Sequence, residues 1–222
     1  MKVTGRSRAA AVLVALMLFG IGFATVTLRK AQTAETTRMS KRLLGPIDIG
    51  FAQWMAQHHD QAILMSQIMM AKPGSQLGRL ATAIQTKQLI EVGQMQGWLL
   101  LAGEALHPRS REMDWMLLGP ASLDQGLSDY LAACRASEGG MPGMASTDEL
   151  NALREQQGAE ADRYFIGLMI RHHIGALPMA QFASKYAEAE QVRGLATNMY
   201  NEQNREMQYL QGLMSSKFSL QD

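Results

Sequence analysis

The feature that most constrains the fold of this chain is a motif that occurs twice. The first copy reads DIGFAQWMAQHHDQAILM from Asp48, and the second reads DRYFIGLMIRHHIGALPM from Asp162. An aspartate, a phenylalanine, two methionines, an alanine and a pair of adjacent histidines occupy the same places in both copies. A repeat of this kind is typical of a helical bundle formed by duplication of a helix hairpin.

On an α-helix that advances about 100° per residue, the shared side chains of each copy fall on one face. Imidazole and thioether groups are therefore presented together, around the small Ala62 in the first copy and Ala176 in the second. We predict that this face binds a metal ion. The predicted ligands are Met55, His58, His59, Met65, Met169, His172, His173 and Met179.

The ligand types favour copper. Thioether sulfur is soft and neutral, and together with imidazole it suits Cu(I) and, by the same reasoning, Ag(I). The single cysteine, Cys134, rules out a cysteine-based zinc or iron–sulfur site. A methionine stripe is more often core filler, and a lone buried histidine is more often hydrogen-bonded than ligating. Two adjacent pairs at equivalent places favour ligation over packing.

Four weaker candidates accompany these ligands. Asp48 and Asp162 lie about three helical turns before the histidine pairs, and three roles are open: support of the ligands, helix capping, or ligation of Cu(II). Met141 and Met144 form a Met-Pro-Gly-Met sequence in a glycine-rich stretch, where a methionine pair can hold a soft metal on an exposed loop.

The N-terminus carries an apolar segment. Residues Ala9 to Leu28 contain no charge and would span about 30 Å as a helix, the thickness of the bilayer hydrocarbon. Arg29 and Lys30 follow where a cleavage site would stand, so we favour an uncleaved anchor over a cleaved export signal. We place the anchor or signal at 1–30 and a linker at 31–46. More basic residues follow the segment than precede it, and by the positive-inside rule this opposes export of the domain that follows. The chemistry of the predicted metal site favours an exported domain.

The rest of the chain is predicted to be all-α. Aromatic content is 6% against 47% hydrophobic residues, so leucine, alanine, isoleucine and methionine must form the core. We expect long helices at 47–71, 76–102, 159–185 and 188–215, and short ones at 122–136 and after Ser146, which begins a capping box with Glu149. The bundle domain then covers 47–217, with repeats at about 47–104 and 159–215. Pro178 should kink the third long helix, and the role of 105–145 is open.

Several function classes have no support. A net charge of +1 provides no basic footprint for nucleic acid. Nucleophile elbows, phosphate loops and dinucleotide fingerprints are missing, so no enzymatic activity is indicated. Glu104-x-x-His107 has the spacing of di-iron bundles, but Pro108 follows at once and indicates a helix end. The alternatives to a copper protein are a ferritin-like metal-dependent oxidase and a structural membrane protein whose histidines only form hydrogen bonds.

These motifs together resemble the domain-of-unknown-function 305 family. The resemblance rests on Phe51 to Met65, Gln88 to Glu91, Met141 to Met144 and Phe165 to Met179. It implies a ferritin-like four-helix bundle and an exported copper-binding role in copper tolerance. We therefore expect a membrane-anchored protein that sequesters copper outside the cytoplasm, or hands it to a partner protein.

Overall fold

The computed structural model describes residues 25–30, 32, 35, 43–110, 112–119, 125–137 and 139–218. The chain divides into two units, Met1–Arg42 and Leu43–Asp222, and the second contains both repeats. Of the first unit, residues 25–30 are helical, whereas most of the predicted membrane segment Ala9–Leu28 and of the linker 31–46 lies outside the described residues. Within the described ranges, no helix combines the length and apolar character needed to cross a membrane.

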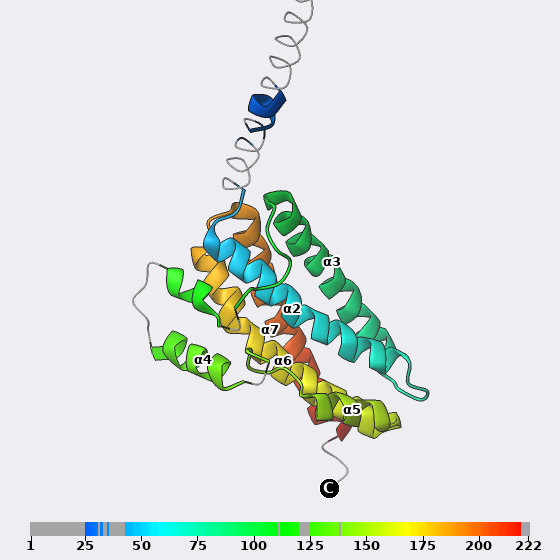
Figure 1. The fold of residues 1–222 in the computed structure, drawn as a ribbon. Helices are drawn as coiled ribbons and strands as arrows, with labels where there is room; N and C mark the ends of the chain where they lie inside the picture. The colour runs from blue at the N-terminus through cyan, green and yellow to red at the C-terminus, as the bar shows by residue number, and fades with distance from the viewer. Residues whose placement is uncertain are drawn as a thin grey trace, which may run out of the picture. The chain divides into compact units, whose positions relative to one another are not determined.

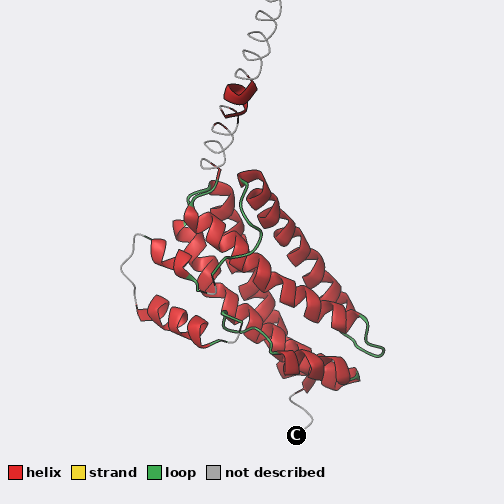
Figure 2. Cartoon of the chain, in the orientation of Figure 1, coloured by secondary structure: helices red, strands yellow, loops and turns green. Residues whose placement is uncertain are grey.

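The described part of Leu43–Asp222 contains helices and loops but no strand, which confirms the all-α prediction (Figure 2). Two antiparallel hairpins make up most of it, and they pack together through the first helix of each (Figure 1). The long helices are α2 (Pro46–Met70), α3 (Gly78–Ala102), α6 (Gly158–Tyr186) and α7 (Glu190–Phe218). Shorter elements lie between the hairpins: η1 (Asp114–Leu118), α4 (Gln125–Ala136) and α5 (Thr147–Glu155).

The predicted helices are present with boundaries shifted by a few residues. The capping box forms before α5: the Ser146 hydroxyl accepts from the Glu149 amide at 3.1 Å, and the Glu149 carboxylate accepts from the Ser146 amide at 2.8 Å. α3 ends at Ala102, ahead of His107, as the proline signal indicated. α6 continues as a helix through Pro178. Ile174, whose carbonyl loses its usual donor, is exposed, so water can replace that donor.

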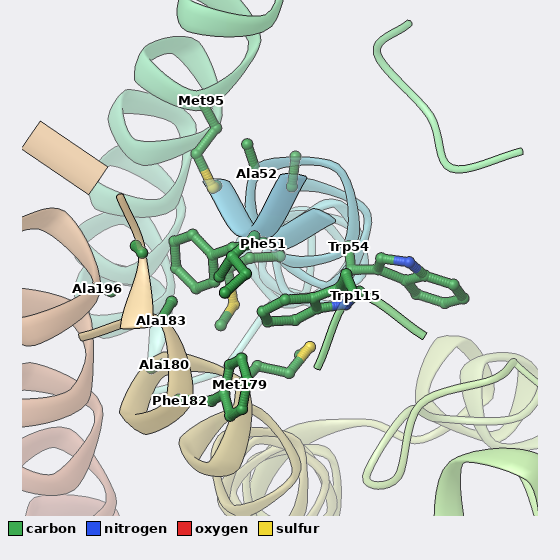
Figure 3. Close-up of a cluster of buried hydrophobic side chains, with 14 of the residues drawn as sticks. Phe51, Ala52, Trp54, Met95, Trp115, Met179, Ala180, Phe182, Ala183 and Ala196 are labelled. Atoms are coloured by element: carbon green, nitrogen blue, oxygen red, sulfur yellow. The ribbon is translucent and has the colours of Figure 1, made fainter. Parts of the chain in front are cut away.

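The core lies on both sides of the contact between α2 and α6. One cluster surrounds Phe51, whose ring meets Trp115 edge-on at 6.2 Å, and Trp115 in turn meets Phe182 at 5.6 Å (Figure 3). A second cluster surrounds Phe165. The sequence did not predict η1, which carries Trp115 onto α2 at Gly50, where a Cβ would collide with the indole. Glycine at this position is therefore required for the close approach of η1 to α2.

The two motif aspartates act as caps that link the hairpins. Asp48 on α2 accepts from the backbone N–H groups of Gly45 at 2.7 Å, Glu188 at 2.9 Å and Ala189 at 3.1 Å, and so fixes the chain entering α7. Asp162 on α6 accepts from the Ser75 hydroxyl at 2.7 Å and from the backbone N–H of residue 76 at 3.0 Å, ahead of α3.

Of the three roles left open for Asp48 and Asp162, these contacts support capping, because both carboxylates accept hydrogen bonds from the loops. Support of the metal ligands and ligation of Cu(II) stay predictions. Each aspartate also joins the start of the first helix of its own repeat to the loop that follows the first helix of the other repeat. α2 and α6 therefore run antiparallel, and their histidine pairs meet near the middle of both helices.

Candidate metal centre

The first histidine of each pair lies at the contact between α2 and α6. The rings of His58 and His172 have centroids 3.7 Å apart and are inclined by 38°. His172 Nε2 lies 3.0 Å from the carbonyl oxygen of His58, and because a carbonyl only accepts, this nitrogen carries the proton. Both side chains are completely buried. Equivalent histidines of the two repeats thus meet at one place in the core.

The second histidine of each pair faces the partner helix of its own hairpin. His59 Nε2 lies 2.8 Å from a Glu91 carboxylate oxygen of α3, and His173 Nε2 lies 2.7 Å from a Glu206 carboxylate oxygen of α7. Each of these glutamates ends a Gln-x-x-Glu sequence, one on α3 and the other on α7. The two hairpins repeat the same contact.

Several buried imidazole nitrogens have no hydrogen-bond partner among the described residues. They are His58 Nδ1 and Nε2, His59 Nδ1, His172 Nδ1 and His173 Nδ1. A buried polar atom without a partner costs roughly 1–3 kcal/mol. Core packing alone would not concentrate five such atoms around one helix contact. A neutral imidazole has one protonated nitrogen and one nitrogen with a lone pair, so each of the four rings can offer one lone pair of the kind that binds a metal ion.

The protonation state of the central histidines suits ligation. Burial lowers the pKa of His58 well below its ordinary value, and the imidazoles of His59 and His173 lower it further. The pKa of His172 is also well lowered, first by burial and then by His58. Both rings are consequently neutral at pH 7, and the neutral ring is the form that binds metals.

The predicted methionine ligands are fully buried and lie in two groups. Met55 and Met179 belong to the core cluster around Phe51, whereas Met65 and Met169 belong to the cluster around Phe165. This distribution follows from the antiparallel arrangement of α2 and α6. A methionine before the histidines in one repeat shares a cluster with a methionine after the histidines in the other repeat. Each cluster therefore contains one predicted methionine ligand from each repeat.

The histidines do not by themselves form a ready-made site. Among the described residues, no three His, Cys, Asp or Glu side chains converge in a way that could hold a metal ion. His59 and His173 each use Nε2 to contact a glutamate, and the ring centroid of His173 lies 6.2 Å from that of His172. A soft-metal site at this place would therefore have to combine imidazole with thioether sulfur.

The loop that contains Met141 and Met144 lies across α2 and α6 beside the histidines. Gln61, two residues after His59, makes two hydrogen bonds to the backbone of Ala145, at 2.6 and 2.8 Å. This role had no sequence signal, because one glutamine on a helix does not indicate its partner. Met141 is buried and Met144 partly buried, so the expectation of an exposed loop was wrong: the loop is held against the core.

Two glycines allow this loop to approach α6. A Cβ on Gly143, whose φ is 84°, would collide with the Arg171 carbonyl, and one on Gly175 would collide with the Pro142 carbonyl. The Gly175 carbonyl also accepts from the buried Tyr130 hydroxyl at 3.0 Å. The loop and α4 are thus both attached to the turn of α6 that follows the histidine pair.

Gly175→Ala is expected to lower the free energy of unfolding by about 1–3 kcal/mol, because its Cβ would displace backbone atoms of the loop. The matched control is Gly167→Ala on the same helix, where a Cβ meets only the end of Met214 at 4.0 Å. That control should stabilise the protein by about 0.5–1 kcal/mol through helix propensity. Urea unfolding measures both, and equal effects of the two substitutions would contradict the close contact at Gly175.

Comparisons with known proteins agree with this architecture. A family model described as a domain of unknown function, DUF305, matches residues 48–214. The DUF305 protein structure from Streptomyces coelicolor is 29% identical, with a TM-score of 0.64, covering 76% of this chain and 92% of that chain. A DUF305 fragment from Deinococcus radiodurans is 27% identical, with a TM-score of 0.59, covering 78% and 97%.

A third similar structure is CopM in its Cu(I)-bound form. It is 22% identical, with a TM-score of 0.54, and the match covers 77% of this chain and 97% of that chain. CopM has also been solved in Cu(II)-bound and silver-bound forms. At this identity the likeness concerns the fold. No curated protein matches the chain.

Proposed function

Because the chain belongs to the DUF305 family, we propose that it binds copper outside the cytoplasm, for sequestration or for transfer to a partner protein. The observation that carries this proposal is the group of buried imidazole nitrogens without partners, close to four buried methionines on the same two helices. His58 and His172 would be the central ligands, and the four methionines would supply sulfur.

The chemistry of the side chains supports copper over other metals. Neutral imidazole and thioether ligands favour Cu(I) and Ag(I), whereas calcium and magnesium need oxygen ligands and zinc usually recruits thiolate or carboxylate. CopM, which has a similar fold, has been solved with Cu(I), Cu(II) and silver, and Cu(I) and silver are the two ions that this preference favours. Met141, which is buried in the same cluster as Met55, remains a weaker candidate ligand.

The apolar segment within 1–30 would anchor the protein in a membrane or direct its export. The soft-metal chemistry of the site and the family resemblance favour the periplasmic or extracellular side for the bundle, although the basic residues after the segment oppose it. The ferritin-like four-helix arrangement is supported by the packing of the two hairpins through α2 and α6. A role in copper tolerance follows from the family resemblance.

The oxidase alternative has weaker support. A di-iron or di-copper oxidase site of the ferritin type needs carboxylates that converge between the helices. Glu91 and Glu206 do reach histidines, but each contacts one ring on its own hairpin. The arrangement therefore favours binding of a soft ion over carboxylate-bridged metal chemistry.

Changing His58, His59, His172 and His173 to alanine in the full chain is expected to abolish tight Cu(I) binding, because every imidazole ligand is removed. The measurement is an anaerobic Cu(I) competition titration with a chromogenic chelator, on protein purified in detergent. His107→Ala is the matched control, since His107 is an exposed histidine outside both pairs, and the variant should bind copper like the wild type.

Circular dichroism shows whether the quadruple variant keeps its helices, and the double variant His58→Ala/His172→Ala provides a milder change if it does not. A folded wild type that binds no Cu(I) would overturn the proposal. A folded histidine variant that keeps the full Cu(I) affinity would show that copper binds elsewhere in the protein. In the structural alternative, these substitutions alter stability and leave metal content unchanged.

A further inference from the structure

The two outer histidines are each held through one ring nitrogen by a carboxylate. In the α2–α3 hairpin the contact is His59 Nε2 to Glu91, and in the α6–α7 hairpin it is His173 Nε2 to Glu206. The remaining nitrogen of each ring, Nδ1, is buried and has no partner. An ionised carboxylate only accepts hydrogen bonds, so Nε2 must carry the proton in both rings.

This pattern determines where the lone pair of each neutral ring lies. A neutral imidazole has one protonated and one unprotonated nitrogen, and the hydrogen bond made by one nitrogen selects the tautomer. With Nε2 donating to glutamate, the lone pair of His59 and of His173 is on Nδ1. His172 follows the same rule, since its Nε2 donates to the His58 carbonyl and its Nδ1 has no partner.

The geometry points to Glu91 and Glu206 as positioning residues that hold His59 and His173 in the Nε2–H tautomer and thereby present Nδ1 to the metal. This inference rests on the proposed copper-binding function and deepens it by naming the ligating atom. A carboxylate that orients a histidine in this way fixes the ring and makes the lone pair more basic, and loss of such a partner typically weakens metal binding by 10–100-fold.

The two contacts differ in exposure. The Glu91 side chain is 9% exposed and the Glu206 side chain 21%. A hydrogen bond in a drier environment is stronger, because water competes less for the donor. Loss of Glu91 should therefore weaken copper binding more than loss of Glu206.

The first test examines the tautomers without any metal. Long-range proton–nitrogen NMR spectra of the full chain labelled with ¹⁵N-histidine distinguish protonated from unprotonated ring nitrogens. At pH 8, His59 and His173 of the wild type are expected to show a protonated Nε2 and an unprotonated Nδ1. In the double variant Glu91→Leu/Glu206→Leu this tautomer should lose its dominance, whereas in Glu91→Gln/Glu206→Gln the amide oxygen can still accept from Nε2–H and should preserve it.

The second test measures Cu(I) affinity of the same proteins. The leucine pair should bind Cu(I) about 10–100-fold more weakly than the wild type, and the glutamine pair should stay within about tenfold. Copper loading should shift the Nδ1 resonances of His59 and His173 more than those of Nε2. Glu202→Gln, one turn before Glu206 and paired with the surface residue Lys87, is the matched control and should change neither tautomer nor affinity.

The outcomes separate this inference from the proposed function. A wild type that binds no Cu(I) overturns the copper proposal, while the tautomer spectrum still decides the role of the glutamates. If the wild type binds copper but carries the proton on Nδ1, or if the folded leucine pair binds as tightly as the wild type, the positioning role is wrong. A purely structural role would lower stability in the leucine pair without changing the tautomer or the nitrogen that responds to copper.

Discussion

Replacing Met55, Met65, Met169 and Met179 together by leucine is expected to lower the affinity for Cu(I) at least about a hundredfold, roughly 2.8 kcal/mol. The substitution keeps the shape and burial of each side chain but removes the sulfur that selects a soft ion. Each swap of methionine for leucine in a core costs less than about 1.5 kcal/mol. The effect on copper should therefore exceed the effect on the fold.

Competition titrations with Cu(I) and Ag(I) measure this effect, and circular dichroism with urea unfolding follows the fold. Two partial variants divide the site, Met55→Leu/Met179→Leu in one core cluster and Met65→Leu/Met169→Leu in the other. The matched control is Met199→Leu, a buried methionine of α7 that is not a predicted ligand. Unchanged Cu(I) affinity in a folded fourfold variant would show that the methionines are core filler.

Asp48→Ala is expected to lower the free energy of unfolding by about 3 kcal/mol. The substitution leaves three backbone N–H groups, at Gly45, Glu188 and Ala189, without the buried carboxylate that accepts from them, and each orphaned donor costs roughly 1–3 kcal/mol before relaxation and water entry. For a domain of this size the melting temperature should fall by roughly 6–12 °C. Thermal and urea unfolding of the copper-free protein measure the loss.

Three further substitutions test the capping role itself. Asp48→Asn keeps one acceptor oxygen and should cost less than Asp48→Ala. Asp162→Ala removes one backbone and one hydroxyl contact, so its cost should also be smaller. Asp129→Ala, at an exposed position on α4, is the control and should stay within about 0.5 kcal/mol of the wild type. An Asp48→Ala protein as stable as this control would show that the cap contributes little.

Much of the local structure was predictable because its causes are local. Hydrophobic periodicity indicated the long helices, and Ser146 with Glu149 indicated the start of α5, since a capping box involves only neighbouring residues. The repeat placed the histidines and methionines on one face of each first helix. η1 was missed because its position depends on the packing of Trp115 against Gly50, a contact between distant segments.

The site differs from its prediction where the partner of a site residue comes from a distant part of the chain. Periodicity identified the face that holds His59, but it did not show that Glu91 would take Nε2 and leave Nδ1 unpartnered. The loop with Met141 looked exposed because it is rich in glycine. Those glycines instead let the backbone approach α6 closely, and this approach buries Met141.

The sequence by itself predicted helices throughout the bundle, two hairpins that begin with the same motif, and imidazole and thioether on one face of the first helix of each. Only the tertiary structure decided that α2 and α6 run antiparallel, so that His58 meets His172 and each core cluster holds one predicted methionine ligand from each repeat. The physical reason is that a helical pattern specifies which side chains share a face. What that face meets depends on long-range packing and on the caps that join one hairpin to the other.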